Sequence, residues 1–547
     1  MILLCACENY LDLTPKGVTL LDNLTEIEYL LNGDYKNSAY EFEDLYIITN
    51  DSYGKMANPS TVLANNVGLA YALMAYDESV DRYAYTSSNQ QYNAYYSNIN
   101  RMNILLAQLD DLSGDTALKA SLAAEAKVLR AYWHYLLVNI FAAQYDAATA
   151  DEQGGIPYVT DMNLEKVNEK LTLAEVYRLL LEDCSEETIN NLPDKAVNIL
   201  RPGKAMGYAL RAKIHLQMKN YPEAFKDVEK ALAFNGNIED RLPVITESLY
   251  YYDKEHPSVI FYAEPTVAKA YIITQETAAL FEQGDILMKY GKSALTEATE
   301  TRDNRVWSAT AAATYKNGIE GDIYMWQGYS NAKWTSAGIT SDQLYYIKAE
   351  CLIRAGHYQD GLDEVNKVRR FRIDPDDYSD LIAANEQDAM AKLMRAKRIE
   401  CLFTYNNFFD MKRWNSEEDY KQTITRTVNG KTYATPKAKI QCFNQARIKE
   451  TSIKVKKGSL SFQWGKVGGA SGYDVYISTK PKKGYKKVKS VGKNTTKLTI
   501  RKFKGKKINP KKTYYMYVET KKKNGSKVNK SGRLYYWNTK SKNFGYF

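Results

Sequence analysis

The spacing of apolar residues divides the chain into a long helical part and a shorter strand-rich part. Between residues 117 and 141 apolar side chains recur every three or four positions, which is the spacing of one face of an α-helix. Over 171–193 the same spacing predicts one helix that begins after Thr172, a suitable N-cap, and stops at Pro193. Beyond about residue 445 the period changes to two, as in β-strands. We therefore expect a mainly α fold followed by a small all-β domain.

Two segments of the helical part repeat one another. Residues 208–232 and 345–369 align at a constant offset of 137 positions, with small residues at matching places and a tyrosine at each turn. Small residues where two helices cross are typical of tetratricopeptide helical hairpins. The segment between them, 240–340, lacks regular periodicity and is rich in aromatic residues, glycine and threonine. Long irregular insertions on a helical scaffold are common places for binding surfaces.

The C-terminal segment, 445–547, has the pattern of an immunoglobulin-like sandwich. Its alternating runs, separated by Gly, Pro, Asn and Lys turns, are SLSFQWGKV, YDVYIST, KKVKSV, KLTI, TYYMYVET and RLYYWN. About seven short strands in roughly 100 residues are typical of that architecture. The early Trp464 and the run INPKKTYYMYV, in which Tyr514 would form a tyrosine corner, resemble a fibronectin type III module. Such modules generally act as spacers or adhesive units without catalytic sites.

Charge separates the two parts as clearly as the hydrophobic pattern does. Residues 447–547 carry 29 Lys and Arg against three acids, whereas residues 1–446 carry 45 against 62, so the net charges are +26 and −17. Clustered lysines neutralise phosphates, which raises the question of nucleic-acid binding. These lysines are spread over nearly every strand and turn, and no nucleic-acid motif is present. We therefore expect no nucleic-acid partner; a solvated surface or an affinity for anionic polymers accounts for the charge.

The sequence offers little for catalysis, metals or cofactors. The six cysteines form no CxxC pair, and neither they nor the four histidines show metal-ligand spacing. Phosphate-binding, zinc-protease and nucleophile-elbow motifs are absent from the sequence. His134 falls within a helical pattern, where packing explains it better than catalysis. We predict that the protein is not an enzyme and has no cofactor and no metal site.

The acidic part contains a set of motifs whose order is informative. CENYLDLTPKG is followed by NAYYSNINRMNILLAQLDDL, by EAKVLRAYWHYLLVNIFAAQYD and finally by LMRAKRIECLFTYNNFFDMKRWN, which ends in a D-x-K-R-W pattern. Over about residues 7–430 this ordered set resembles the SusD/RagB-like outer-membrane nutrient-binding lipoproteins. The Pro- and Asn-rich segment that usually closes the family is replaced here by the basic domain. That junction leaves two accounts open, a fusion of two modules or a misjoined sequence.

The resemblance implies a non-catalytic cell-surface lipoprotein that captures oligosaccharides. In the family such proteins deliver their nutrient to a TonB-dependent, SusC-like transporter in the outer membrane. It implies a SusD-like, tetratricopeptide-containing helical domain over 18–440, with the Lys-rich fibronectin III-like sandwich at 445–547 attached to it. The alternative hypothesis is a tetratricopeptide scaffold that binds peptide or protein partners and has no carbohydrate role.

The first residues of the chain indicate the cellular compartment in which the protein is expected. The segment Leu4–Cys7 has the Leu–small–Cys form of a bacterial lipobox, although the apolar residues before it are fewer than the about 7–15 of a signal peptide. We expect residues 1–17 to be a truncated lipoprotein signal and N-terminal tether. Cys7 would carry the lipid that anchors the full-length protein to the outer membrane at the cell surface.

Aromatic side chains in two irregular regions are the expected ligand contacts. Tyrosine is the compositional outlier, with 45 residues against 15 Phe and 7 Trp, and its flat apolar face and polar tip suit recognition. In the family, sugar-contacting aromatics tend to come from regions that correspond to 76–96 and 307–334. The predicted contacts are Tyr83, Tyr85, Asn89, Tyr92, Trp307, Tyr324, Trp326 and Trp334. An ordinary place in the core or on the surface is the alternative for some of them.

Overall fold

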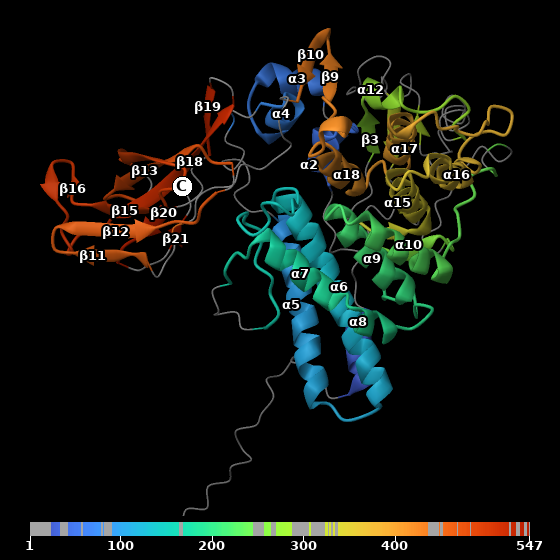
Figure 1. Cartoon of the computed structure of the whole chain (residues 1–547), viewed down its shortest axis with the longest axis horizontal. Coiled ribbons are helices and arrows are strands. Elements are labelled where there is room, and N and C mark those ends of the chain that lie inside the picture. The colour runs from blue at the N-terminus through green and yellow to red at the C-terminus, as the bar shows by residue number, and fades with distance from the viewer. Residues whose placement is uncertain are drawn as a thin grey trace, which may run out of the picture.

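The computed structural model of the chain contains a helical unit and a strand-rich unit (Figure 1). It describes residues 23–32, 42–55, 58–77, 90–162, 168–243, 256–263, 270–286, 306–307, 323–326, 328–329, 332–333, 337–435, 452–467, 469–481, 483–524, 527–531, 536–540 and 544–545, with residues 80, 245 and 448. Among these residues, every helix is too short or too polar to span a lipid bilayer.

The helical unit is built around one long helix. The helices are α1 (Leu24–Leu31), α2 (Glu43–Ile48), α3 (Pro59–Asn65), α4 (Leu69–Met74), α5 (Gln90–Asp111), α6 (Thr116–Phe141), α7 (Leu173–Asp183), α8 (Glu186–Asn190), α9 (Lys204–Gln217), α10 (Tyr221–Phe234), α12 (Gln275–Ala278), α15 (Ser341–Arg354), α16 (Tyr358–Arg369), α17 (Glu386–Glu400) and α18 (Asn406–Trp414), with a 3-10 turn at Glu418–Tyr420. In Figure 1, α5 and α6 form a long antiparallel pair. The apolar spacing over 117–141 thus predicted α6 correctly.

Helix α6 is buried on nearly all sides, so its charged residues need partners inside the protein. Its N-cap, Asp115, accepts hydrogen bonds from two backbone amides of the first turn. Arg130 forms an ion pair with Asp183 at the end of α7, with 2.6 Å between nitrogen and oxygen. Glu125 is paired in the same way with Arg201 at 2.7 Å. These paired charges fix α6 against its neighbours in one orientation.

The two repeated segments form two helical hairpins, α9–α10 and α15–α16. The helix starts in the second hairpin follow those of the first by the expected 137 positions, from Lys204 to Ser341 and from Tyr221 to Tyr358. A Cβ at Gly361 would lie 2.7 Å from the backbone oxygen of Ala349, so this crossing requires glycine. Helix α10 packs against α15, which stacks one hairpin on the other.

One sequence prediction needs correction, because the helix expected over 171–193 is broken in two. Thr172 caps α7 as predicted, since its hydroxyl accepts a hydrogen bond from the backbone amide of Glu175. The helix then ends at Asp183, and Ser185 caps the new helix α8 by accepting from the amide of Thr188. Serine stabilises a helix start better than a helix interior, because its hydroxyl competes for backbone amides. Asp183, the last residue of α7, forms the ion pair with Arg130.

The strands lie in short sheets of the helical unit and in the C-terminal unit. They are β1 (Ser52–Lys55), β2 (Val259–Phe261), β3 (Ala270–Ile273), β4 (Val306–Trp307), β5 (Ile323–Trp326), β6 (Gly328–Tyr329), β7 (Ala332–Lys333), β8 (Ile339–Thr340), β9 (Thr425–Val428), β10 (Lys431–Ala434), β11 (Lys454–Lys456), β12 (Ser459–Gln463), β13 (Gly472–Ser478), β14 (Lys486–Gly492), β15 (Lys497–Ile500), β16 (Lys502–Phe503), β17 (Lys506–Lys507), β18 (Tyr515–Asn524), β19 (Lys527–Lys530), β20 (Tyr536–Asn538) and β21 (Phe544–Gly545). The alternating runs thus predicted strands in the right places.

The C-terminal unit has two antiparallel sheets around its own apolar core. One sheet has the order β11-β12-β15, and the other has the order β14-β13-β18-β20-β21, with β19 paired to β18. Trp464 and Tyr473 are among the buried residues between them. The hydroxyl of Tyr514 accepts a hydrogen bond of 3.0 Å from the backbone amide of Asn509, the contact that defines a tyrosine corner.

Candidate functional site

A four-stranded antiparallel sheet of the helical unit brings three of the predicted ligand positions together. Its strand order is β1-β3-β5-β4, so segments that are far apart in the sequence lie side by side. Trp307 of β4 stands opposite Tyr324 of β5, and Trp326 follows two residues later on the same strand. Opposite residues of an antiparallel pair, and residues two apart on a strand, belong to the same face of a sheet. The three positions therefore share one face.

The fully buried Ile273 shows which face is the other one. This residue of β3 stands opposite Ile323 of β5 and belongs to the main hydrophobic core. Because successive residues of a strand alternate between faces, positions 323 and 324 lie on opposite sides of the sheet. The face that holds the aromatic positions is thus opposite to the face of Ile273.

Of the other predicted ligand contacts, only Tyr92 is among the residues that the structure describes. Tyr92 lies half buried on α5, with its ring centroid 4.7 Å from that of Tyr96 and 5.2 Å from that of Phe141 on α6. Its packing role is therefore clear, and its role in ligand contact stays a prediction. Tyr83, Tyr85, Asn89, Trp334 and the lipidation residue Cys7 lie outside the described residues.

Two interior cavities of the helical unit are too small for a sugar ring. One, beside Arg241 and Tyr346, has a volume of about 20 Å³, and the other, beside Lys213 and Gln343, has a volume of about 10 Å³. A single water molecule needs a cavity of roughly 10–15 Å³ measured in this way. These two cavities therefore suit water, and an oligosaccharide would have to bind elsewhere on the protein.

One cluster of carboxylates has the composition of a metal site but is already neutralised. Oxygens of Glu239, Asp342 and Glu400 lie within 4.8 Å of one another. Arg372 reaches Glu400 at 2.8 Å and Asp342 at 3.2 Å, and Arg241 reaches Glu239 at 2.9 Å. Burial raises the pKa of Asp342, although the neighbouring Arg372 acts in the opposite direction. A metal ion would have to displace these arginines, so the cluster is best explained as a structural ion network.

His134 of α6 has a packing role, as its helical surroundings indicated. Its Nδ1 is 2.9 Å from the backbone oxygen of Arg130, and its Nε2 accepts a hydrogen bond from the backbone amide of Val159. The ring stacks on Tyr158, with centroids 3.8 Å apart. Burial lowers the pKa of His134 to about 3, so the ring is neutral at physiological pH. Both nitrogens are engaged, which makes this histidine unsuited to proton transfer.

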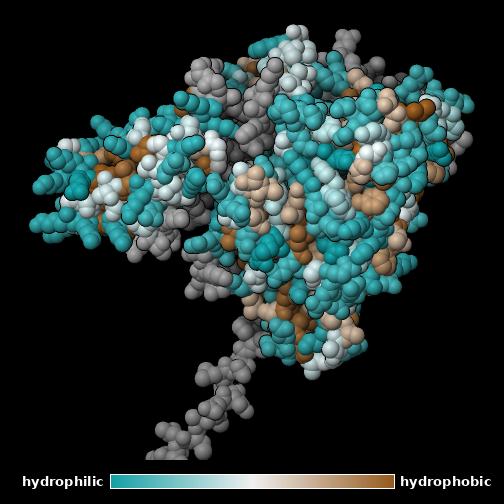
Figure 2. Space-filling model, viewed as in Figure 1, coloured by the Kyte–Doolittle hydropathy of each residue, from teal (hydrophilic) through white to brown (hydrophobic). Residues whose placement is uncertain are grey.

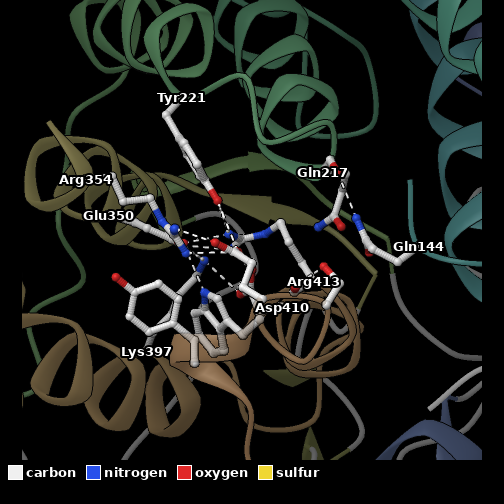
Figure 3. A network of polar contacts seen from close by, with 12 residues as sticks. Gln144, Gln217, Tyr221, Glu350, Arg354, Lys397, Asp410 and Arg413 are labelled. Atoms are coloured by element: carbon white, nitrogen blue, oxygen red, sulfur yellow. Dashed lines mark hydrogen bonds and ion pairs between the residues drawn. The ribbon is translucent and has the colours of Figure 1, made fainter. Parts of the chain in front are cut away.

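The D-x-K-R-W segment at the end of α18 forms a buried network of ion pairs (Figure 3). Arg413 donates to both carboxylate oxygens of Glu350 on α15, at 2.6 and 2.7 Å, and to Asp410 at 2.8 Å. Lys397 of α17 pairs with Asp410 at 2.7 Å. The indole nitrogen of Trp414 donates to Glu350 at 3.0 Å. Figure 3 shows these side chains converging from three helices, so the segment joins α15, α17 and α18.

A fourth helix is attached through the lysine of the same segment. The ammonium group of Lys412 donates to the backbone oxygens of Asn139 and Ala142, at 2.5 and 3.2 Å, at the end of α6. These carbonyl groups have no partner within the helix, and a cation there also matches the negative end of the helix dipole. The motif therefore holds the scaffold together.

Comparison with protein families identifies the scaffold. A family model described as starch-binding and associating with the outer membrane matches residues 9–216, and the model of the SusD family matches residues 140–537. The second match alone spans more than half of the chain. The chain belongs to the SusD family. As a SusD-family protein it is a member of a non-catalytic, carbohydrate-binding family associated with the outer membrane. The comparison with curated proteins returned no match.

Solved structures of SusD-type proteins have the same fold. A SusD-like carbohydrate-binding protein of Bacteroides vulgatus is 14% identical, with a TM-score of 0.52 over 76% of this chain and 89% of that one. A SusD superfamily protein of the same organism is 14% identical, with a TM-score of 0.53 over 73% and 89% of the two chains. A SusD superfamily protein of Bacteroides thetaiotaomicron is 16% identical, with a TM-score of 0.51 over 72% and 89%. At these identities the likeness establishes the fold alone.

Glu350 is the residue of this SusD-family protein that sequence reasoning missed. Its carboxylate accepts hydrogen bonds from three side chains, and two of them, Arg413 and Trp414, are more than sixty residues away in the sequence. Periodicity places it only as one polar residue on a helix. The available signal was a charged residue at matching places of both repeats, Lys213 and Glu350, together with a distant D-x-K-R-W motif.

Proposed function

We propose that this SusD-family protein captures oligosaccharides at the outer surface of the outer membrane and passes them to a TonB-dependent, SusC-like transporter. The observation that carries the proposal is the shared sheet face of positions 307, 324 and 326, on a scaffold that belongs to a carbohydrate-binding family. Flat aromatic side chains on a sheet offer apolar surfaces to the C–H faces of sugar rings, and neighbouring polar groups orient the hydroxyls.

We further propose the finer assignments that the resemblance implies. The hairpins α9–α10 and α15–α16 are tetratricopeptide units, and they form the surface that faces the transporter. The C-terminal unit is a fibronectin III-like sandwich, and Cys7 carries the lipid that holds the full-length protein on the membrane. Their support is the 137-residue repeat, the tyrosine corner at Tyr514 and the lipobox form of Leu4–Cys7.

Affinity gel electrophoresis tests the carbohydrate assignment. Gels that contain starch, other neutral polysaccharides or no glycan are run with the full chain and with the double variant Trp307→Ala, Trp326→Ala. We expect retardation by at least one polysaccharide and a loss of at least about tenfold in affinity in the variant, which corresponds to about 1.4 kcal/mol. Tyr29→Ala is the matched control, since this tyrosine of α1 is 69% exposed and lies outside the sheet.

Two results would contradict the proposal. One is the absence of retardation by every polysaccharide, and the other is equal retardation of the wild type and the double variant. Binding of peptides in the absence of any glycan binding would favour the alternative hypothesis of a tetratricopeptide scaffold. Release of sugar products during the incubation would show an enzyme and overturn the non-catalytic assignment.

A further inference from the structure

The outer face of the sheet β11-β12-β15 in the C-terminal unit is polar, and none of its positions is acidic. Its strands alternate, so that Leu460 and Phe462 point into the core and the residues between them lie on the outer face. The positions on the outer face are Lys454, Lys456, Ser459, Ser461, Gln463, Lys497 and Thr499. We call this set the Lys454 face. It combines three exposed ammonium groups with a floor of hydroxyl and amide groups.

The register arranges these groups in rows. Lys454 stands opposite Ser461, which stands opposite Thr499, and Gln463 stands opposite Lys497 in the next row. Lys454 and Lys456 are two residues apart on β11, which separates their Cα atoms by about 7 Å, and two strands in a sheet are about 10 Å apart when one strand lies between them. A polymer with regularly spaced anionic groups can therefore meet several ammonium groups of this face at once.

The lysines of the Lys454 face have no carboxylate partner among the described residues. Two of the three acids in residues 447–547, Asp474 and Glu519, lie instead on β13 and β18 of the other sheet. There, three other lysines already surround Asp474, with nitrogen–oxygen distances of 3.0 to 3.7 Å. The positive charge of the Lys454 face is therefore available to an external anion.

We propose that the Lys454 face binds acidic polysaccharide, a chain of sugars that carries carboxylate or sulfate groups. Charge complementarity selects an anionic polymer, because this unit has a net charge of +26. The hydroxyls of Ser459, Ser461 and Thr499 can each donate and accept a hydrogen bond, as sugar hydroxyls require. In Figure 2, hydrophilic side chains project from the outer end of this unit. The site is separate from the aromatic sheet and does not depend on the function proposed for it.

The same face is less suited to nucleic acid. Proteins that bind single strands without sequence preference combine a basic groove with aromatic side chains on which the bases stack. None of the positions of the Lys454 face is aromatic. Lysines on edge strands such as β11 also prevent unwanted strand pairing. If the lysines had only that role, charge reversal of any exposed lysines of the unit would change polymer binding equally. Charge reversal at lysines outside the Lys454 face is therefore the control.

The test measures binding of the full chain to immobilised polygalacturonate and heparin, with soluble starch as the neutral glycan. We expect K454E/K456E/K497E to bind both acidic polymers at least tenfold more weakly than wild type. The neutralising variant K454Q/K456Q/K497Q should show a smaller loss and guards against misfolding, which circular dichroism also checks. The control K486E/K489E/K493E changes charge by the same amount on exposed lysines of β14 and the turn after it, and it should lose less than twofold.

Three results would overturn the proposal. They are the absence of binding to either acidic polymer, an equal loss in the test and control variants, and equally tight binding of single-stranded or duplex DNA through the same three lysines. Binding should weaken as salt increases, because lysines that pair with a polyanion release its counterions. Retention of starch by the aromatic sheet should stay unchanged in every lysine variant, which separates failure of this proposal from failure of the carbohydrate assignment.

Discussion

Replacing Glu350 with glutamine tests whether the buried network at the end of α18 holds the scaffold together. The carboxylate of Glu350 is fully buried and accepts hydrogen bonds from Arg413, Arg354 and Trp414. Glutamine has nearly the same volume, so the substitution creates no cavity. It removes the negative charge and turns an amide NH₂ group towards a guanidinium that can only donate.

The expected cost follows from the charges that remain. Three cations, Arg354, Lys397 and Arg413, face three anions, Glu350, Asp410 and Glu417, in this network. Without Glu350 one buried positive charge is uncompensated, and removal of one partner of a buried pair costs about 3–5 kcal/mol. Each step of about 1.4 kcal/mol changes an equilibrium tenfold, so local opening should become about two to four orders of magnitude more frequent.

Native-state hydrogen exchange measures this opening in peptides from α15, α17 and α18. The method does not require two-state global unfolding, which a multidomain chain need not show. The control is Glu175→Gln, which removes the acid of an exposed ion pair with Arg178 on α7. We expect no measurable change in exchange for this control, because exposed ion pairs contribute little. Exchange in the three helices that is the same in both variants would refute the reasoning.

Acid provides a second readout for the same variant. Although burial alone would raise the pKa of Glu350, the neighbouring Arg413 holds that pKa well below its ordinary value. A carboxylate with a lowered pKa stabilises the fold above the unfolded value, near 4.5, and the stabilisation is lost as the pH falls below it. The difference in stability between wild type and Glu350→Gln should therefore shrink below pH 4.5. A difference that is constant across this range would contradict an ionic origin.

Three further substitutions test other parts of the structure. Burial lowers the pKa of Lys213 from 10.5 to about 8, so the unfolded chain binds more protons than the folded chain between these pH values. The wild-type free energy of unfolding, measured in urea, should therefore rise by about 3 kcal/mol from pH 8 to 10.5, and this rise should be absent in Lys213→Met. Gly361→Ala should lower thermal stability by about 1–3 kcal/mol through its clash with Ala349, whereas Ala224→Gly at the matching place should cost only about 1 kcal/mol. Tyr514→Phe should cost the C-terminal unit about 1 kcal/mol in thermal unfolding.

Local patterns predicted the elements because local forces determine them. The apolar spacing over 117–141 gave α6, and the repeat placed two hairpins whose helix starts differ by the expected 137 positions. Alternation indicated the strands of the C-terminal unit for the same reason, since a strand such as β12 buries every second residue. The break before α8 was missed because a single serine decides between a continuous helix and two capped ones.

The contacts that tie the elements together could not be predicted in this way. Arg413 and Glu350 are 63 residues apart, and Arg426 donates to the backbone of Ile47 across 379 residues. No periodicity connects such positions. The register of β4 on β5, which brings positions 307 and 324 together, is likewise set by a tertiary pairing of short strands. The candidate residues could therefore be named from the sequence, but their common face could not.

The D-x-K-R-W segment shows what a shared motif identifies in this family. Every residue of α18 is buried, although three of its last five residues are charged, and each of these charges meets a different helix. A motif of this kind constrains the packing of α6, α15, α17 and α18 and contains no group directed at a ligand. Its presence therefore identifies the scaffold and not the sugar. Ligand choice has to be sought outside this motif, and substitutions at positions 307, 324 and 326 of the aromatic sheet should change which glycan is bound while leaving the fold intact.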